Sequence, residues 1–455
     1  MKSLKILSLA AALGLAPLMA LAAPASPQSF VKACPGTSAL ATFADCVNYL
    51  EARLGPEIPD WVVHSTTYSY WARKPLYDAA GRAVPGPDGQ QACGRIPQSG
   101  RIFYPPTWRL PFQRDLPLVV YPHFTALRKL SVPSAFGGHE WAFGAAAALY
   151  YGFAVAMPDL PGAGADAKDY HPFCHGKSLA YATVDGIPAM QAMFRKDPYL
   201  VSGGYSWDGR LFLLGYSEGA YAALAAVKEL ETHAAEYAGR FTLTGSACMA
   251  GPFDLSGLAR EDFIKPGGAS SLCFFLPYLM VAYHDVYGPL FNLQDAFAPV
   301  LLETREDGSI LDWLDGGLDG LTVDDLIARR LGKPRHLLPF RAMLNPAWVA
   351  RDLDDPAYAT SAAHRLLQDN DLHRGWTPTR PILFCQSPMD DDVSFQQTVE
   401  TMDNLGAEIV KAGGDPGKLL ILKPIGDCRD NITHIMAIPL AMNMGFRWIY
   451  DLPRP

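Results

Sequence analysis

The stretch LLGYSEGA, residues 213–220, is the most informative part of this chain. Ser217 lies between Gly215 and Gly219, with an apolar run before them and an Ala-rich run after them. A serine in this setting is typical of a sharp strand-turn-helix elbow that presents its hydroxyl above a sheet. Side chains at the two glycines would collide with the neighbouring strand and helix. The pattern therefore predicts that Ser217 is a nucleophile, and the alternative is an ordinary strand-to-helix glycine turn.

Around this elbow, apolar runs rich in β-formers alternate with Ala/Leu-rich helical runs from about residue 100 onward. Alternation of this kind predicts an α/β fold with a mostly parallel central sheet flanked by helices. Strands are predicted at 116–121, 152–157, 210–214, 243–249, 381–385 and 419–423, and helices at 41–54, 142–149, 218–237 and 435–451.

The alternation stops between about residues 252 and 381, which predicts an inserted, mainly helical cap. Within it, residues 306–325 hold seven acids and no base. We expect this segment to be a solvated helical face, since the alternative, a calcium site, does not fit the spacing of the oxygens. The predicted organisation is a signal peptide at 1–22, an N-terminal extension at 23–100, a core at 101–255 and 375–455, and a cap at 256–374.

The first 22 residues have the composition of a cleaved signal peptide. Lys2 and Lys5 precede an apolar run at 6–18, and Ala20 and Ala22 supply small residues before a cleavage site. The run is shorter than the roughly 20 apolar residues that span a bilayer, which disfavours the alternative of a membrane anchor. The sequence therefore predicts a secreted or periplasmic protein, and a glycosylation sequon at 431–433, beside a candidate catalytic histidine, favours a bacterial source.

The composition excludes some partners. The formal net charge is −8, and −10 once the two lysines of the leader are removed, which argues against nucleic acid. No later run is long enough to span a membrane, and no motif with metal-ligand spacing occurs, so neither a metal nor a cofactor is expected. Of the eight cysteines, Cys248 and Cys385 lie in strand-like runs and are expected to be free; some of the other six are expected to pair.

A serine nucleophile needs a base, usually a histidine oriented by a carboxylate, and in this architecture the chain order is serine, acid, histidine. Of eleven histidines, only His434 follows the last two predicted strands. The acid is expected after the strand at 381–385, where three aspartates occur in succession at 390–392. Their position favours Asp390, with Asp392 as the alternative.

The oxyanion of a tetrahedral intermediate needs two backbone N–H donors. One is expected from Glu218, the residue after the nucleophile, and the other from the loop that follows the strand at 116–121, with Thr125 as the candidate. His123 in the same loop is expected to brace it rather than to act as a base.

With these blocks in place the chain resembles the α/β-hydrolases, and within them the secretory lipase/esterase group. The similar blocks lie at 117–125, 152–190, 211–224 and 381–393, together with the late His434. The resemblance implies a triad of Ser217, Asp390 and His434, and a cap that serves as a lid and shapes an acyl pocket. The family usually has His-Gly where this chain has His123 and Phe124, and a glycine at the position of Ser387.

The hypothesis that follows is a serine hydrolase that cleaves small or lipidic carboxylic esters through an acyl-enzyme. The alternatives are a serine peptidase or aminoacyl hydrolase on the same triad, or a binding protein that keeps the fold without catalysis. The sequence leaves chain-length preference, disulfide pairing and oligomeric state open.

Overall fold

A computed structural model describes residues 42–51, 55, 57–107, 114–265, 267–268, 270–289, 291–335 and 338–453. The predicted signal peptide at 1–22 lies outside these described residues, as does Cys34.

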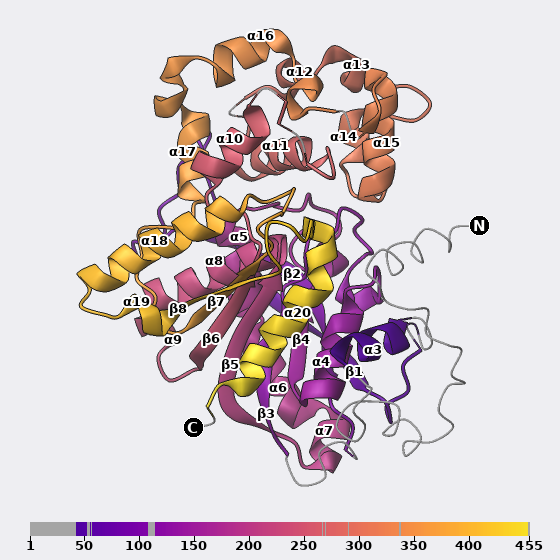
Figure 1. Cartoon of the computed structure of the whole chain (residues 1–455), viewed down its shortest axis with the longest axis vertical. Coiled ribbons are helices and arrows are strands. Elements are labelled where there is room, and N and C mark those ends of the chain that lie inside the picture. The colour runs from indigo at the N-terminus through magenta and orange to yellow at the C-terminus, as the bar shows by residue number, and fades with distance from the viewer. Residues whose placement is uncertain are drawn as a thin grey trace.

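The centre of the molecule is one eight-stranded sheet in the order β1-β2-β4-β3-β5-β6-β7-β8 (Figure 1). The strands from β3 to β8 pair in parallel, while β2 pairs antiparallel with both β1 and β4. The α/β architecture predicted from the sequence is thereby confirmed. The strand bounds are β1 His64–Pro75, β2 Cys93–Tyr104, β3 Asp115–Val120, β4 Ala154–Pro158, β5 Ser206–Tyr216, β6 Thr242–Met249, β7 Ile382–Gln386 and β8 Leu420–Pro424.

Both faces of the sheet are buried, because side chains of a strand alternate between its two faces. On β5, Leu211 and Leu213 face one core and Phe212 and Leu214 face the other. One face is covered by α3 (Phe43–Tyr49), α4 (Trp141–Tyr151) and α20 (His434–Asp451). The opposite face is covered by α5 (Gly176–Asp185), α6 (Ile187–Lys196), α8 (Glu218–Thr232) and α18 (Phe395–Lys411). Shorter helices at the rim are α7 (Pro198–Gly203), α9 (Ala234–Tyr237), α19 (Pro416–Leu419), η2 (Pro133–Ala135) and η3 (Gly164–Asp166).

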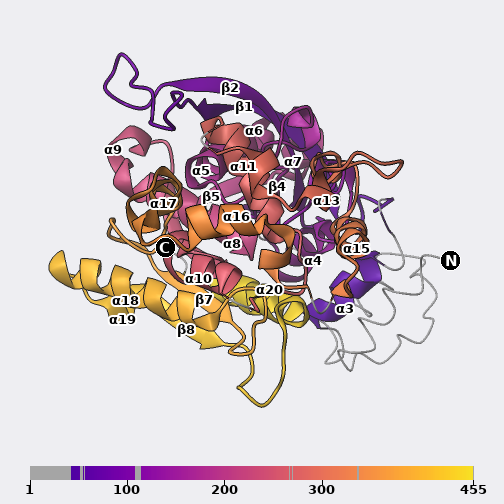
Figure 2. The same cartoon turned by 90° about the horizontal axis from the view of Figure 1, so that it is seen from above.

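Between β6 and β7 the chain leaves the sheet and forms a separate layer of short helices above it (Figures 1 and 2). Seen from above, these helices lie over the sheet, with the β1–β2 ribbon at one side and α18 at the other (Figure 2). They are η4 (Leu255–Ala259), α10 (Arg260–Ile264), α11 (Phe275–Tyr287), α12 (Leu293–Ala296), α13 (Pro299–Leu302), α14 (Ile310–Trp313), α15 (Gly320–Leu331), η6 (Phe340–Met343), α16 (Pro346–Trp348), η7 (Val349–Leu353), η8 (Pro356–Thr360) and α17 (Ala362–Asp369).

Two features differ from the sequence predictions. No strand was predicted in the extension at 23–100, yet β1 and most of β2 lie there and complete the sheet. The acidic segment at 306–325 is not wholly solvated, because Asp324 is fully buried. Its carboxylate accepts hydrogen bonds from the N–H of Phe274 at 2.9 Å and from the thiol of Cys273 at 3.2 Å, and so holds α15 against the start of α11.

The cysteines agree with expectation where the structure describes them. Cys248 and Cys385 are buried free thiols, as predicted. Cys93, Cys174, Cys273 and Cys428 are free as well, so none of these four takes part in the pairing that was expected for some of the other six cysteines. The thiols of Cys93 and Cys273 donate instead to Gln91 O and Asp324 Oδ1.

Candidate active site

Ser217 sits at the junction of β5 and α8 in a strained backbone conformation, with φ 56° and ψ −125°. Positive φ is uncommon for a residue with a side chain and is found where the surroundings enforce it. Here a Cβ at Gly215 would lie 2.1 Å from Gly219 O, and a Cβ at Gly219 would lie 2.3 Å from Pro122 O. Both glycines are therefore required by close backbone contacts, and the turn is the sharp elbow expected from the motif.

His434 is the first residue of α20, and its side chain is buried. Its Nδ1 lies 2.8 Å from Asp390 Oδ2 and 3.0 Å from Asp390 Oδ1. The imidazole packs on Tyr216, the residue before Ser217, at 4.9 Å between ring centroids, and the Tyr216 hydroxyl donates to His434 O at 2.7 Å. These contacts place the ring beside the elbow with one nitrogen held by a carboxylate.

The three successive aspartates have three different roles. Asp390 contacts the imidazole of His434, Asp391 accepts the backbone N–H of His434 at 2.9 Å, and Asp392 accepts the N–H and hydroxyl of Ser271 from the cap, both at 2.6 Å. Only the carboxylate of Asp390 is thus aimed at the ring.

Asp390 is itself held in place by the turn after β7. Its Oδ1 accepts the N–H groups of Asp392 and Val393 at 3.0 and 2.8 Å, and its Oδ2 accepts the amide of Gln386 at 3.2 Å. The side chain is 0% exposed, so these bonds supply what water cannot. Gln386 was not singled out from the sequence, and its place as the last residue of β7 is the one signal that could have pointed to it.

Charges around His434 set its protonation. Burial lowers the pKa of His434, but the negative charge of Asp390, the hydrogen bond to it and the charges of Asp391 and Asp392 outweigh burial, so the pKa is raised above its ordinary value. An imidazole with a raised pKa is a better proton acceptor when a neighbouring hydroxyl attacks.

Hydrogen bonds from buried side chains fix two successive peptide groups of the loop after β3. The N–H of Phe124 donates to both carboxylate oxygens of Glu140 at 2.9 Å, and His123 contacts Phe124 O through Nδ1 and Asp159 O through Nε2, each at 2.7 Å. His123 therefore contacts backbone oxygens on both sides, in keeping with the bracing role expected for it. Because Phe124 C=O and Thr125 N–H belong to one planar peptide group, holding the carbonyl also orients the N–H of Thr125.

Glu140 was not anticipated from the sequence. It is buried at the start of α4, and burial raises its pKa well above the ordinary range. The hydroxyl of Tyr121 also donates to it. In the sequence, an acid directly before an Ala-rich helix is typical of a residue at the start of a helix. Only the fold shows that Glu140 faces the loop after β3.

The side chain of Glu218 is buried rather than exposed to solvent. It is 1% exposed, and its Oε1 pairs with Nε2 of His171, whose Nδ1 lies 2.6 Å from Pro161 O. Burial lowers the pKa of His171, but the charge of Glu218 and its hydrogen bond raise it overall. The backbone N–H of Glu218, as the first of helix α8, has no partner within the helix and is available to an anion.

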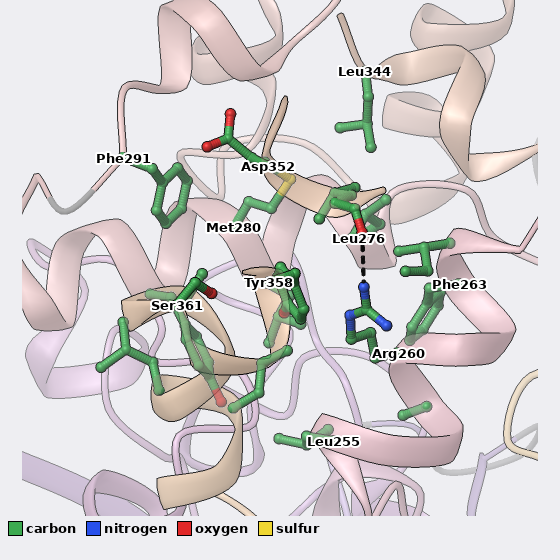
Figure 3. A pocket seen from close by; sticks show the side chains of 18 of the residues that line it. Leu255, Arg260, Phe263, Leu276, Met280, Phe291, Leu344, Asp352, Tyr358 and Ser361 are labelled. Atoms are coloured by element: carbon green, nitrogen blue, oxygen red, sulfur yellow. Dashed lines mark hydrogen bonds between the residues drawn. The ribbon is translucent and has the colours of Figure 1, made fainter. Parts of the chain in front are cut away.

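A small pocket of about 40 Å³ opens at Ser217 and is lined by Ser217, Glu218 and Thr125 together with cap residues. A larger cavity of about 290 Å³ lies within the cap and is mostly apolar (Figure 3). The two share Leu255, Ala259, Phe263 and Leu279 in their walls, so the cap cavity adjoins the pocket at Ser217.

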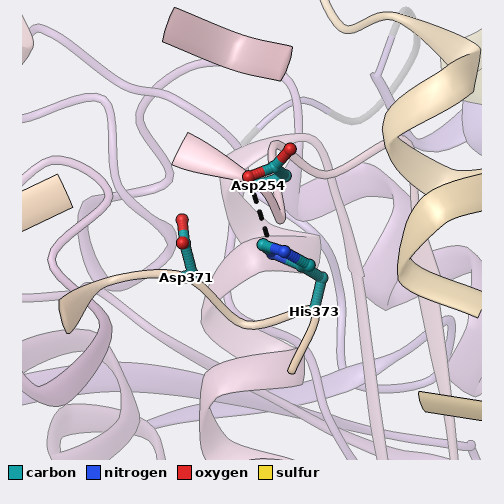
Figure 4. Close-up of side chains that lie close together, drawn as sticks. All are labelled: Asp254, Asp371 and His373. Atoms are coloured by element: carbon teal, nitrogen blue, oxygen red, sulfur yellow. Dashed lines mark ion pairs between the residues drawn. The ribbon is translucent and has the colours of Figure 1, made fainter. Parts of the chain in front are cut away.

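One group of side chains has the composition of a metal site. Ligand atoms of Asp254, Asp371 and His373 lie within 4.8 Å of one another (Figure 4). Both oxygens of Asp254 accept N–H groups, from Gly257 at 3.0 Å and Leu258 at 2.8 Å.

Asp371 is also occupied by protein donors. It accepts the N–H and hydroxyl of Ser256 at 2.9 and 2.6 Å, and it pairs with Arg374. The guanidinium of Arg374 and the N–H donors already bind the carboxylate oxygens of Asp254 and Asp371. A cation would have to compete with these donors. We therefore interpret the cluster as a clasp that ties together the two chain segments by which the cap joins the core.

Searches against family models and against curated proteins gave no match. Solved structures do match. A putative hydrolase from Legionella pneumophila superposes with a TM-score of 0.64 at 17% identity, over 91% of this chain and 96% of that one. The rice cell wall degrading esterase LipA from Xanthomonas oryzae superposes with a TM-score of 0.61 at 20% identity, over 84% of this chain and 89% of that one. The likeness confirms the α/β-hydrolase fold; the narrower group within that fold stays a prediction.

Proposed function

We propose that this protein is a serine hydrolase that cleaves carboxylic esters through an acyl-enzyme, with Ser217, His434 and Asp390 as its triad. The observation that carries the proposal is the pairing of the His434 imidazole with the buried Asp390 carboxylate beside the strained elbow of Ser217. Strained backbone and a raised histidine pKa are both features that concentrate at functional sites.

In this mechanism the hydroxyl of Ser217 attacks the ester carbonyl while Nε2 of His434 accepts its proton. Asp390 stays ionised and stabilises the imidazolium through Nδ1. The imidazolium then protonates the departing alcohol, and a water molecule, deprotonated by the same histidine, releases the acid from Ser217. The N–H groups of Glu218 and Thr125 are proposed to bind the oxyanion, and no step calls for a cofactor.

The cap cavity supports an ester with an apolar acyl chain. Its walls are mainly aliphatic and aromatic, and they continue into the pocket at Ser217. At about 290 Å³, the cavity lies near the lower end of the range of small-molecule pockets. We therefore expect acyl chains of moderate length to be preferred over long ones, and the name of the esterase LipA agrees with an ester substrate.

A peptidase or aminoacyl hydrolase on the same triad is the second candidate, because the acids Glu218, Asp262 and Asp392 line the pocket at Ser217. A free carboxylate there would bind a substrate amine. Each of the three already has a protein partner, however: His171, Lys265 and Ser271, respectively. The ester hydrolase is therefore favoured, and faster turnover of aminoacyl anilides than of simple esters would reverse the order.

The proposed location is outside the cytoplasm, in the periplasm or the medium, on the strength of the leader composition at 1–22. None of the helices described is both long and apolar enough to cross a bilayer.

The test is active-site labelling. An alkyl fluorophosphonate is expected to modify Ser217 in the wild-type protein and to leave Ser217→Ala unmodified, with loss of p-nitrophenyl ester hydrolysis in the variant. Labelling that persists in Ser217→Ala would exclude this nucleophile. Absence of ester hydrolysis by the wild-type protein would favour the remaining alternative, a binding protein with this fold.

A further inference from the structure

Arg260 places a guanidinium in the wall of the mostly apolar cap cavity (Figure 3). It comes from the first residue of α10 and lies over the ring of Tyr358, at 3.9 Å from the ring centroid. One terminal nitrogen donates to Leu353 O at 3.0 Å. A guanidinium has five N–H donors, so most of its hydrogen-bonding capacity is left for other groups.

Within the part of the chain that the structure describes, Arg260 forms no ion pair, and its Nε is buried without a hydrogen-bond partner. A buried donor without an acceptor costs free energy that a bound acceptor would recover. The hydrogen bond to Leu353 O and the contact with Tyr358 thus leave N–H donors of this guanidinium free for a further acceptor.

Nearby acids do not fill this role. Asp352 lines the same cavity, but its carboxylate accepts a hydrogen bond from Nε of Arg351 at 2.8 Å. Asp354 binds both terminal nitrogens of Arg341, at 2.8 and 2.6 Å. Both carboxylates therefore form their hydrogen bonds with other arginines, and Arg260 interacts with Asp354 only at longer range.

We propose that the cap cavity binds an aliphatic carboxylate, with Arg260 holding the carboxylate and the apolar walls holding the chain. The planar fork of a guanidinium binds the two oxygens of a carboxylate better than any other side chain does. Aliphatic and aromatic walls, among them Phe291, Leu344 and Trp348, suit the chain.

Two sources share this chemistry. The carboxylate is either the far end of the acyl group of the ester being cleaved, which is then a half-ester of a dicarboxylic acid, or the head of a free fatty acid. The first source rests on the proposed function, since the chain must pass from Ser217 into the cap through the walls that the two cavities share. The second source does not depend on catalysis.

The binding arm of the test uses calorimetric titration of the full chain with octanoate and with 1-octanol, which differ in the charged head. The wild-type protein is expected to bind octanoate at least about tenfold more tightly than 1-octanol. In Arg260→Met the ratio of the two affinities should fall about tenfold or more, which is the usual effect of losing a charge-assisted hydrogen bond. Arg329→Met removes an exposed cap arginine outside the cavity and should keep the preference. Arg260→Lys, which keeps the charge without the fork, is expected to fall between wild type and Arg260→Met.

The turnover arm compares mono-p-nitrophenyl suberate with p-nitrophenyl octanoate. If the acyl group is the source, the ratio of their kcat/KM values falls about tenfold or more in Arg260→Met and is unchanged in Arg329→Met; because the ratio is taken within each variant, a general loss of activity cancels. A ratio that stays constant, with octanoate binding still dependent on Arg260, identifies a free fatty acid. Equal binding of octanoate and 1-octanol to the wild-type protein, or a preference that survives in Arg260→Met, overturns the proposal. Failure of the wild-type protein to hydrolyse either ester counts against the proposed function and leaves the binding arm to decide the cavity.

Discussion

The backbone of Ser217 is strained, and the strain places its side chain at the turn between β5 and α8. Its φ of 56° is enforced by the close approach of Gly215 to Gly219 and of Gly219 to Pro122. Strain of this kind costs of order 1–3 kcal/mol and is compensated elsewhere in the fold. Stability and activity are therefore opposed at this position.

Replacing Ser217 by glycine should remove the strain together with the hydroxyl. We expect Ser217→Gly to raise the free energy of unfolding by about 1 kcal/mol over Ser217→Ala, because alanine keeps a Cβ at positive φ. Denaturant unfolding of the two variants, both without hydrolytic activity, gives the comparison. Equal stability of the pair would show that the elbow is not strained in solution.

The three aspartates after β7 allow a matched test at adjacent positions. Asp390→Asn is expected to lower kcat by about 10⁴-fold, as loss of the orienting carboxylate does in serine hydrolases. Asp392→Asn should change kcat by less than about tenfold, because its carboxylate binds Ser271 rather than the ring. A larger loss in Asp392→Asn than in Asp390→Asn would reassign the acid.

The raised pKa of His434 predicts the pH profile. Activity needs the neutral imidazole, so kcat/KM should rise with pH through an apparent pKa above 6.5, and Asp390→Asn should shift that pKa downward. For stability the sign is opposite: the charged ring stabilises the fold below pH 6.5, and this contribution is lost as pH rises through the folded pKa. Rates with p-nitrophenyl acetate and unfolding measured over the same pH range check both trends.

At the scale of elements, the elbow and the turn after β7 were predictable because their signals are local. Two glycines around Ser217 and three aspartates after an apolar strand are visible in a few residues of sequence. The contact of Glu140 was not predictable, because it acts on a loop that the sequence alone cannot place beside it. Gln386 directly precedes the turn of Asp390, but the sequence does not show that its side chain binds that carboxylate. The β1–β2 ribbon was missed for a related reason. Its strands pair antiparallel without an intervening helix, so the alternation that marked the parallel strands is absent there.

Within the cap, Asp324 joins α15 to the start of α11, and its burial gives that contact a pH dependence. Burial raises the pKa of Asp324 to about 6, against 3.8 for the exposed group. The folded state therefore binds the proton more tightly than the unfolded chain, and stability from this residue falls as pH rises from about 4 to about 6, by up to about 3 kcal/mol.

Asp324→Asn should remove this dependence. Thermal unfolding at pH 4.5 and 7.5 is expected to show a smaller difference between the two pH values in the variant than in the wild-type protein. Asp325→Asn, at the next position of the same helix, is the matched control, since no hydrogen bond ties it to α11 among the residues described. An identical pH effect in wild type and Asp324→Asn would contradict the assignment.

At the scale of the whole molecule, the cap and the core meet at the walls shared by the two cavities. Leu279 on α11 lies in both, so a larger side chain there should narrow the passage between them. Leu279→Trp is expected to lower kcat/KM for p-nitrophenyl decanoate at least about tenfold relative to the acetate, because chain atoms lose their place in the cavity.

Leu321→Trp provides the control, because Leu321 is 54% exposed on α15 and lines neither cavity. The measurement is a rate profile across p-nitrophenyl esters from acetate to palmitate. A profile of Leu279→Trp that parallels the wild type would mean that acyl chains do not enter the cap.

The insertion of the cap between β6 and β7 also has a consequence for the order of assembly. Met249 and Cys385 pair in adjacent strands, yet the entire cap separates them in the chain. Contacts between residues so distant in sequence tend to form late in folding, because the loop between them must first be closed. During synthesis, the residues of the elbow at Ser217 are added well before those of the turn at Asp390 and of the helix that begins at His434. A partly synthesised or prematurely cut chain therefore carries the proposed nucleophile without its proposed base, and we expect such a chain to lack hydrolytic activity.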